Sequence, residues 1–414
     1  STAEVAAVLR YCHAHRQPVV THGGLTGLVH GADTTADQLI LSLERMRTIE
    51  RVDPVQRVAH AQAGATLQAV QEAAEAHGLS FPLDLGGRGS ATIGGNASTN
   101  AGGNRVIRYG MTRDMVLGLE AVLADGTVVS SLNSLIKNNA GYDLKQLFIG
   151  TEGTLGVITR LVLRLREKPT TTNMAFAAFD GFDRIPAFLK HMDRRLGGTL
   201  SAFEVMWRSF YLLVTTPPAR GKPPVGQDHP YYALVESQGS DRELDTRRFN
   251  AAMETALDEG LIVDAAIAQS DADCHDFWSL RDDVGQIMVQ GTPAIFDVSL
   301  PIAEMERYTR DLDTAMTAAI GAHRLYIFGH LGDGNLHLAV PTSAADHAAL
   351  RPKIEEAVYR GLAAFRGSVS AEHGIGLEKK PWLSISRTPE EIALMRTIKA
   401  ALDPLGLLNP GKVF

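Results

Sequence analysis

At residues 86–104 the chain reads GGRGSATIGGNASTNAGGN, a stretch dominated by glycine and small polar residues. A segment with so few side chains forms neither a packed helix nor a good strand, and we expect a loop whose backbone approaches another group closely. A second glycine-rich segment, THGGLTGLVHG, lies at residues 21–31. Backbone N–H groups in such loops can converge on an anion because no side chain stands in the way. Two separate loops of this kind predict one ligand that lies across both.

Neither loop matches the common nucleotide-binding signatures. The chain has no G-x-G-x-x-G that opens a helix in a βαβ unit and no G-x-x-x-x-G-K-[ST]. An isolated glycine-rich loop is often a plain turn. Here, however, small polar residues are interleaved with the glycines: Ser90, Thr92, Asn96, Thr99 and Asn100. Such side chains can hydrogen-bond a flat heterocycle and a ribityl chain, which favours a binding role.

The bulk composition is that of an ordinary globular protein. The 414 residues are 45% hydrophobic and 21% charged, and the net charge of −7 gives no basic footprint for nucleic acid. No apolar run reaches the roughly 20 residues that span a bilayer, and no secretory signal is recognisable. The two cysteines, Cys12 and Cys274, are too few for a disulfide framework, so we expect a cytoplasmic protein, with peripheral membrane association left open. The chain starts at Ser1 on a helical pattern, and we expect the true start and a first strand to be missing.

The sequence pattern predicts an α+β protein with three parts. Residues 1–168 hold the glycine-rich loops, residues 169–370 alternate helices and strands as an α+β domain with an antiparallel sheet, and residues 371–414 form a C-terminal helical segment that packs back on the first part. The second part is expected to have strands at 174–179, 231–237, 261–268, 294–300 and 324–329, and helices at 183–196, 241–258, 275–289 and 303–319. In the first part, residues 155–166 alternate apolar and basic residues and predict a strand with one exposed face.

Two further motifs bring possible metal ligands together. They are FGHLGDGNLHL at residues 328–338 and SAEHGIG at residues 370–376. Asp333-Gly334 best fits a two-residue type I′ hairpin turn, which would place His330 directly opposite His337 on one face. Opposed residues have Cβ atoms roughly 4.5–5.5 Å apart, close enough for two imidazoles to bind one ion.

A third ligand is available in Glu372. An N/N/O set suits Zn²⁺, and also Mn²⁺ or Fe²⁺, and three protein ligands leave an open position as in catalytic sites. If residues 371–373 are extended, Glu372 and His373 point to opposite sides, so that one binds the ion while the other faces a neighbouring cavity. A single histidine at a strand end is more often a packing residue, and it is the pair that favours a metal.

The long motifs resemble a known family. The stretches LGGRGSATIGGNASTNAGGNRVIRYG (85–110) and IKNNAGYDLKQLFIGTEGTLGVIT (136–159), with GHLGDGNLH, SAEHGIG and LNPGK (408–412), are similar to vanillyl-alcohol-oxidase-type FAD proteins. More narrowly they resemble the branch that holds D-lactate dehydrogenase, the glycolate-oxidase FAD subunit and D-2-hydroxyglutarate dehydrogenase. The resemblance covers essentially the whole chain. It implies a two-part FAD-binding domain and a substrate, or cap, domain.

The resemblance also implies roles for individual residues. The pyrophosphate loop would consist of His22, Gly23, Gly24, Leu25, Thr26, Gly27 and Leu28. The diphosphate, ribityl chain and isoalloxazine would be wrapped by Leu85, Gly86, Ser90, Thr92, Gly94, Gly95, Asn96, Thr99, Asn100 and Gly102. The adenosine end would be held by Glu152, Gly153, Gly156 and Ile158, and Asn409 would close over the flavin. Leu25 stands where relatives with covalent flavin often have histidine, so FAD is expected to be non-covalent, and His22 is expected to be structural.

The same branch implies the chemistry of the site. The metal ligands would be His330, His337 and Glu372, the base His373, and the substrate-carboxylate clamp Arg281. Relatives specific for D-2-hydroxyglutarate carry Thr, Lys and Asn at three places that here hold Gly285, Ile295 and Ala339. The aliphatic Ile295 in place of a cation favours a smaller or more apolar acid such as D-lactate.

We therefore expect a FAD- and metal-dependent dehydrogenase that oxidises a D-2-hydroxy acid, D-lactate or similar, with D-2-hydroxyglutarate still open. The Cα hydrogen would leave as hydride to flavin N5, with His373 taking the hydroxyl proton. One alternative is the FAD subunit of a multi-subunit glycolate-oxidase complex. A more remote one is a metallohydrolase in which the glycine loops are structural. The electron acceptor would be an electron-transfer flavoprotein, a cytochrome or a quinone, and the expected assembly is a homodimer.

Overall fold

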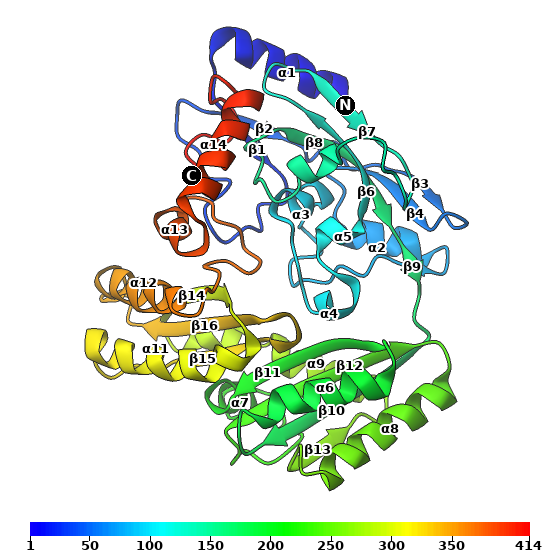
Figure 1. Cartoon of the computed structure of the whole chain (residues 1–414), viewed down its shortest axis with the longest axis vertical. Coiled ribbons are helices and arrows are strands. Elements are labelled where there is room, and N and C mark those ends of the chain that lie inside the picture. Colours follow the sequence, from blue (N-terminus) through cyan, green and yellow to red (C-terminus); the bar gives the residue numbers. More distant parts are fainter. The chain divides into compact units, whose positions relative to one another are not determined.

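The computed structural model describes all 414 residues and divides them into two compact units, shown in Figure 1. Unit 1 consists of Ser1–Arg105, Tyr109–Lys168 and Glu372–Phe414, and unit 2 consists of Val106–Arg108 and Pro169–Ala371. The mixture of helices and mostly antiparallel sheets confirms the predicted α+β class. No helix of this structure is both long and apolar enough to cross a membrane.

Unit 1 is built around a five-stranded sheet in the order β3-β4-β8-β6-β7, in which each neighbouring pair is antiparallel. Two small sheets, β1-β2 and β5-β9, complete it. The elements are α1 Thr2–His15, β1 Val19–His22, β2 Leu39–Ser42, β3 Ile49–Asp53, β4 Val58–Gln62, α2 Leu67–Glu75, β5 Leu79–Ser80, α3 Ile93–Thr99, α5 Thr112–Met115, β6 Val116–Val122, β7 Val128–Ser131, η1 Leu144–Leu147, β8 Val157–Arg164, β9 Arg166–Glu167, η4 Lys380–Trp382, α13 Leu383–Ser386 and α14 Pro389–Leu402.

Strand β8 corrects the prediction of an exposed-face strand at residues 155–166. It is the central strand of its sheet, and six of its eight residues are buried. The basic residue Arg160 does not need open solvent, because Glu50 on the sheet's edge strand β3 accepts its Nε and Nη2 hydrogens at 2.9 and 2.6 Å. The alternating basic residues suggested an exposed face, but Arg160 is instead neutralised by an ion pair within the sheet.

Helix α3 corrects the prediction that residues 86–104 form a loop throughout. Thr92 caps the helix by accepting the N–H of Gly95 at 3.3 Å, and Asn100 ends it in the left-handed conformation at φ 52°. The first turn holds glycine because it packs tightly: a Cβ on Gly94 would lie 2.6 Å from the Cβ of Ala63. Close packing against the neighbouring segment thus overrides the low helix propensity of glycine.

Unit 2 is built on one seven-stranded antiparallel sheet in the order β13-β10-β12-β11-β15-β16-β14, which confirms the predicted antiparallel sheet. The elements are α4 Val106–Tyr109 (its last residue in unit 1), β10 Thr171–Phe179, α6 Arg184–Leu196, β11 Leu200–Trp207, α7 Arg208–Thr215, β12 Tyr231–Gly239, α8 Arg242–Asp258, β13 Asp264–Ile267, α9 Asp271–Asp282, α10 Gly285–Val289, β14 Thr292–Ser299, η2 Ile302–Glu304, α11 Met305–Ile320, β15 Tyr326–His330, η3 Leu331–Asp333, β16 Asn335–Thr342 and α12 His347–Ala363. The structure adds β11, which the prediction lacked, and it divides the predicted helix 275–289 into α9 and α10.

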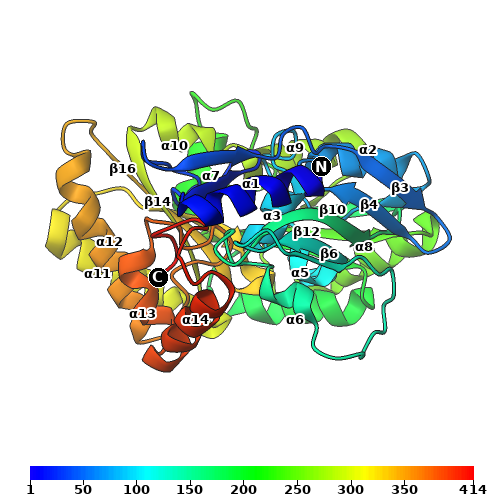
Figure 2. The same ribbon diagram turned by 90° about the horizontal axis from the view of Figure 1, so that it is seen from above.

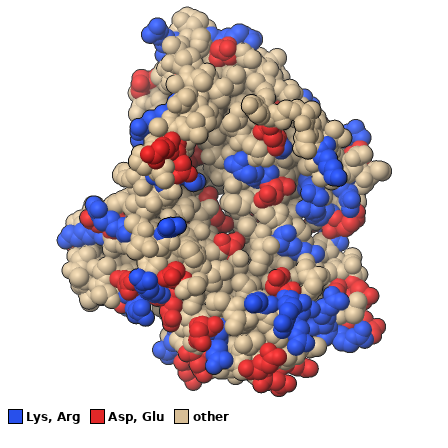
Figure 3. Space-filling model, in the orientation of Figure 1, with Lys and Arg blue, Asp and Glu red and all other residues tan.

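Helices cover both faces of this sheet. On one face, Phe188 of α6 packs against Phe179 of β10 and Phe203 of β11. On the other, Phe277 of α9 packs edge-on against Phe176 of β10. Helices α11 and α12 lie side by side in both views (Figures 1 and 2), and acidic and basic side chains are interspersed over α6 and α8 in Figure 3. Because side chains alternate along β11, Glu204 lies on the α9 face.

The hairpin β15–β16 differs from the predicted two-residue turn. Its loop is a 3₁₀ turn, Leu331–Asp333, followed by Gly334 at φ 86°. The register pairs Phe328 with His337, so His330 does not lie directly opposite His337 as predicted. The two histidines nevertheless share one face, because His330 is two residues from Phe328 and side chains alternate with period two.

Candidate functional site

A cavity of about 1040 Å³ lies within unit 1. The first glycine loop, the start of α3, the turn around Glu152 and the C-terminal segment all line it. The predicted binding residues in the lining are His22, Gly23, Gly24, Leu25, Thr26, Gly27, Leu28, Leu85, Gly86, Thr92, Gly94, Gly95, Asn96, Thr99, Gly102, Glu152, Gly153, Gly156, Ile158 and Asn409. A volume of this size suits a large cofactor.

Two predicted binding residues do not belong to the lining. Asn100 ends α3, and its Oδ1 accepts the N–H of Arg113 at 2.9 Å, so its polarity serves the fold. Ser90 packs against the first loop through its backbone: a Cβ on Gly24 would lie 1.9 Å from the Ser90 carbonyl oxygen. The glycine at position 24 is therefore required by contact between the two loops, whereas Cβ atoms on Gly27 or Gly86 would meet open space.

The prediction also missed part of the lining. The missed residues are Thr21, Val29, His30, Gly31, Ala32, Asp33, Thr34, Leu43, Gly87, Ser98, Ala101 and Val157. Most of them are sequence neighbours of predicted binding residues. Extending the predicted pyrophosphate loop from residues 22–28 to residues 21–34 would have included seven of them. His22, predicted to be structural, has its Nε2 2.9 Å from the carbonyl of Ala32 and so ties the two ends of this loop together.

One buried polar atom in the cavity has no partner in the protein. Asn96 is buried on α3, and its Oδ1 has no hydrogen-bond partner. An unsatisfied buried oxygen is costly unless another molecule supplies a donor. The cavity therefore offers an acceptor to a ligand, beside loops of glycine backbone that suit phosphate groups.

Glu152 holds the segment that carries Glu372 and His373. Its carboxylate accepts the N–H groups of Ile375 and Gly376 at 2.7 and 2.8 Å. Burial raises the pKa of this carboxyl above its ordinary value, although these two hydrogen bonds act in the opposite direction. Asn409 donates its amide hydrogen to the Glu152 carbonyl, so Glu152 ties two distant parts of the C-terminal segment together.

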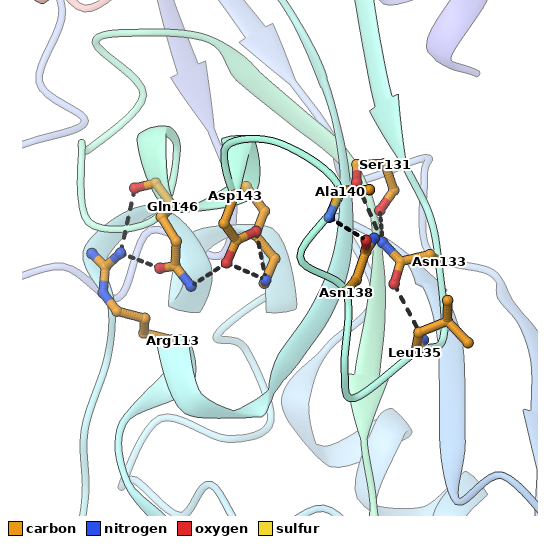
Figure 4. A network of polar contacts seen from close by, with 9 residues as sticks. Arg113, Ser131, Asn133, Leu135, Asn138, Ala140, Asp143 and Gln146 are labelled. Atoms are coloured by element: carbon orange, nitrogen blue, oxygen red, sulfur yellow. Dashed lines mark hydrogen bonds and ion pairs between the residues drawn. The ribbon is translucent and has the colours of Figure 1, made fainter.

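A polar network fixes the chain that leads into Glu152 (Figure 4). Arg113 donates to the side chain of Gln146 and to the carbonyl of Ile149, and Gln146 in turn donates to Asp143 at 3.2 Å. Tyr142, beside this network, is 94% exposed and does not line the cavity.

In unit 2, the histidine pair lies on the sheet face covered by α9. The ring centroids of His330 and His337 are 5.3 Å apart, and the rings are nearly perpendicular. His330 is buried, and its Nδ1 lies 2.7 Å from Oε1 of Glu204 on the neighbouring strand. Glu204 was not predicted, and its only sequence signal is one acidic residue inside the apolar run LSAFEVMW at 200–207.

Arg281 completes this buried group from α9. Its Nε donates to Oε2 of Glu204 at 2.7 Å, and its Nη2 lies 3.2 Å from Nε2 of His330. Burial by itself would raise the pKa of the Glu204 carboxyl, but its contacts with His330 and Arg281 hold the pKa below its ordinary value. The predicted clamp is thus close to a predicted metal ligand.

Glu372 follows directly on Ala371, whose N–H donates to the buried carboxylate of Asp297 at 3.0 Å. His330 and His337 belong to unit 2, whereas Glu372, the third predicted ligand, begins the C-terminal segment of unit 1. Glu372 and His373 both line the cavity of unit 1. The condition for the two side chains to point to opposite sides, an extended chain at residues 371–373, is not met, because the chain bends there.

Comparison with known proteins agrees with this geometry. Residues 168–413 match the family model of FAD linked oxidases, C-terminal domain, and residues 1–131 match that of the FAD binding domain. The mitochondrial D-2-hydroxyglutarate dehydrogenase of Bos taurus is 43% identical over 100% of this chain and 75% of its own length. The D-2-hydroxyglutarate dehydrogenase of Xanthomonas citri pv. viticola is 41% identical over 100% and 88%. A Schizosaccharomyces pombe protein named for D-lactate dehydrogenase is 36% identical over 100% and 80%.

Solved structures show the same fold at low identity. p-Cresol methylhydroxylase with bound substrate gives a TM-score of 0.79 at 16% identity, over 100% of this chain and 87% of that one. 4-Ethylphenol oxidase from Gulosibacter chungangensis gives 0.73 at 18%, over the same shares. These likenesses confirm the predicted vanillyl-alcohol-oxidase-type fold. With its whole length matched by curated relatives and more than half by one family model, the chain belongs to the FAD-linked oxidases.

Proposed function

We propose that this protein is a FAD- and divalent-metal-dependent dehydrogenase that oxidises a D-2-hydroxy acid to the 2-oxo acid. The observation that carries the proposal is the position of Glu372 and His373. Both line the glycine-loop cavity, so it presents a carboxylate and an imidazole together with the glycine-rich loops. The names of the bovine and Xanthomonas relatives support the same class of reaction.

The cavity residues fit FAD. The backbone of residues 22–28 would hold the pyrophosphate, α3 with Asn96 would hold the ribityl chain and ring system, and Glu152 would lie toward the adenosine. When bound, FAD supplies an acceptor for a hydride. Leu25 is 62% exposed and offers no nucleophile for a covalent flavin bond, which supports non-covalent binding.

We propose that His330, His337 and Glu372 together bind a divalent metal of the borderline type. Two imidazoles and one carboxylate suit Zn²⁺ best, with Mn²⁺ and Fe²⁺ as alternatives, and leave coordination positions open. When bound, such an ion supplies positive charge that holds the hydroxyl and carboxylate oxygens of a 2-hydroxy acid and acidifies the hydroxyl.

The remaining steps belong to the chain's own residues. His373 would take the substrate's hydroxyl proton as the general base. Arg281 orients the substrate carboxylate through its planar fork of donors. Loss of that proton and of the Cα hydrogen with its electron pair would turn the substrate's C–O bond into C=O and give the 2-oxo acid, with FAD as the group that would supply the hydride acceptor.

The far end of the substrate is expected to meet apolar side chains. Ile295 on β14 pairs with Ala339 on β16, and each lies two residues from a polar residue of the metal face, Asp297 and His337. These aliphatic groups favour a short or apolar acid such as D-lactate. The named D-2-hydroxyglutarate dehydrogenases among the relatives favour the longer dicarboxylic acid. A comparison of kcat/KM for the two acids decides between them.

The electron acceptor and the assembly remain part of the proposal. We infer an electron-transfer flavoprotein, cytochrome or quinone as acceptor and a homodimer as assembly. The cysteine usage favours the cytoplasm, whereas the bovine relative is named as mitochondrial. A subunit of a larger glycolate-oxidase-type complex is the alternative, and it predicts flavin reduction without multiple turnover. Membership of the FAD-linked oxidases argues against a metallohydrolase.

The test is anaerobic mixing of the FAD- and Zn²⁺-loaded protein with D-lactate and with D-2-hydroxyglutarate. Bleaching of the visible flavin band by a D-acid and not by its L-enantiomer is expected. The variant His330→Ala should bind FAD normally, lose its metal and lose flavin reduction. If no D-2-hydroxy acid bleaches the flavin, the proposed reaction is wrong. If His330→Ala keeps its full metal content, the proposed metal site is wrong.

A further inference from the structure

The buried carboxylate of Glu204 contacts two residues of the proposed site at once. It is 1% exposed in the middle of the unit 2 sheet, where β11 lies next to β15. Its two oxygens receive separate donors, His330 Nδ1 on one and Arg281 Nε on the other, each at 2.7 Å. A buried carboxylate with each oxygen engaged is strongly held in place.

These contacts fix which ring nitrogen of His330 carries the hydrogen. An ionised carboxylate can only accept, so Nδ1 must carry a hydrogen and donate it to Glu204. A guanidinium can only donate, so Nε2, 3.2 Å from Arg281 Nη2, must present its lone pair. Both neighbours therefore require the same neutral tautomer, Nδ1–H with the Nε2 lone pair accepting from Arg281, a contact that a bound metal ion would replace.

That tautomer is the one that binds a metal through Nε2. Histidine ligands commonly donate their second ring N–H to a carboxylate, which sets the ring's orientation and makes the other nitrogen a stronger ligand. The same carboxylate also accepts a hydrogen bond from Arg281 on α9. The guanidinium of Arg281 lies 5.2 Å from the centroid of the Phe328 ring. One side chain thus sets the orientation of two others.

We propose that Glu204 is a positioning residue that presents Nε2 of His330 to the metal and holds Arg281 ready for the substrate carboxylate. This inference rests on the proposed function, because it assigns the same roles to His330 and Arg281. Glu204 itself touches neither substrate nor flavin in this scheme. It couples metal affinity to substrate affinity through one buried carboxylate.

The sheet contains a matched control. Glu236 on the adjacent strand β12 is equally buried, at 1% exposed, and lies on the same face, because Leu234, two residues away, pairs with Glu204. Its oxygens accept from Ser201 Oγ at 2.6 Å and Trp278 Nε1 at 3.0 Å. Removing its charge alters the buried charge of the same face at a carboxylate whose hydrogen-bond donors, Ser201 and Trp278, differ from those of Glu204.

The variant Glu204→Gln removes one acceptor and adds one donor. Because both partners of Glu204, His330 and Arg281, are donors, the side-chain amide nitrogen of the new glutamine must face one of them. If it faces His330, the ring must accept at Nδ1 and carry its hydrogen on Nε2, which removes the ligand lone pair. If it faces Arg281, the clamp is displaced. We expect Zn²⁺ affinity to fall roughly 10- to 100-fold and KM to rise more than kcat falls.

The experiment measures Zn²⁺ affinity by competition with a chromophoric chelator, the visible spectrum of the Co²⁺-substituted protein, and KM and kcat. Glu204→Asp, which keeps two acceptors on a shorter side chain, should recover part of the affinity that Glu204→Gln loses. Glu236→Gln should bind metal as the wild type does. Wild-type metal affinity and KM in folded Glu204→Gln would overturn the inference, and so would an equal loss in Glu236→Gln.

A measurement on the wild-type protein covers the case in which the variants do not fold. The ¹⁵N chemical shifts of the His330 ring in the metal-free protein distinguish the two tautomers, with Nδ1–H expected, and an Nε2–H ring would refute the inference. Failure of the proposed function has a different signature. In that case His330→Ala itself keeps its metal or its flavin reduction, whatever Glu204 does.

Discussion

At the scale of single residues, the side-chain oxygen of Asn96, which has no hydrogen-bond partner, is the most direct evidence for a ligand site in unit 1. The side chain lines the cavity, and its Oδ1 has no partner in the protein. Removing a polar group that makes no hydrogen bond through that atom should cost the fold little, because no protein donor is left unpaired. Its loss should instead be felt by the ligand that supplies the donor.

We therefore predict that Asn96→Ala lowers FAD affinity roughly tenfold while leaving the stability of the FAD-free protein within about 1 kcal/mol of wild type. Fluorescence titration with FAD and urea unfolding of the apoprotein check the two parts. Asn100→Ala is the control with the opposite pattern. It removes the acceptor for the Arg113 N–H and places alanine at φ 52°, so it should destabilise the apoprotein. If Asn96→Ala binds FAD like the wild type, its assignment to the ligand is wrong.

Cys274 gives a prediction about reactivity. Burial, with the nearby carboxylates of Asp271, Glu236 and Asp273, raises the pKa of this thiol to about 11. At a pH near 8, about one thiol in 1,000 is then the reactive thiolate. Cys12 is buried, and its pKa is also raised by burial. Native protein should react with a disulfide reagent such as DTNB far more slowly than unfolded protein, which should titrate both thiols. Rapid modification of one thiol in the native state would contradict this.

The histidine hairpin shows what residue patterns can and cannot predict. The prediction that His330 and His337 share one face is confirmed, because the period of two is a property of any strand. The predicted register is wrong, since Asp-Gly fits several turn types and only the structure shows the 3₁₀ turn at Leu331–Asp333. Glu204 was missed because its partners lie 77 and 126 residues away, a separation that no local pattern carries.

At the scale of elements, contact between the two glycine loops makes a sharp test. Gly24→Ala places a Cβ 1.9 Å from the backbone oxygen of Ser90, which only a shift of one loop can relieve. Overpacking of this kind typically costs about 1–3 kcal/mol. Gly27→Ala in the same loop meets nothing within 4 Å and is the matched control.

We predict that Gly24→Ala lowers both the unfolding midpoint of the apoprotein and its affinity for FAD, whereas Gly27→Ala leaves the apoprotein unchanged. Thermal unfolding followed by circular dichroism and FAD titration measure these effects. An apoprotein of Gly24→Ala as stable as wild type would mean that the loops do not meet as described. A loss of FAD affinity in Gly27→Ala with unchanged stability would place the ligand against that glycine.

Elements with a clear periodicity were predicted well, and those shaped by tertiary contacts were not. The amphipathic helices α6, α8 and α11 begin and end within two residues of the predicted bounds. Helix α3 was not predicted because glycine has a low helix propensity. The sequence gives no sign that Gly94 packs tightly against Ala63. Strand β11 was missed although it lies in the middle of the unit 2 sheet, because the run before Arg208 passes from strand to helix without a break.

At the scale of the whole molecule, the clusters of buried apolar residues keep to one unit or the other. One cluster gathers residues of unit 1 and another residues of unit 2, and every residue that lines the glycine-loop cavity belongs to unit 1. The C-terminal segment Glu372–Phe414 returns to unit 1, so the predicted flavin domain is completed by residues that the sequence places far from its start. A ligand that binds only a folded state stabilises that state by mass action.

FAD should therefore shift the unfolding of unit 1 and leave that of unit 2 where it is. At a free FAD concentration of 100 times Kd, the added stability is about 2.7 kcal/mol, which moves a transition midpoint by several degrees. Tryptophan fluorescence can follow the unfolding of the two units separately, because Trp382 lies in unit 1 while Trp207 and Trp278 lie in unit 2. In the variant Trp382→Phe, tryptophan fluorescence reports on unit 2 alone, and calorimetry reports on both units. We expect FAD to raise one calorimetric transition while the fluorescence midpoint of Trp382→Phe stays constant. A fluorescence midpoint that rises as far as the calorimetric one would show that FAD stabilises both units together. That result would contradict the prediction, which rests on a cavity lined by unit 1 alone.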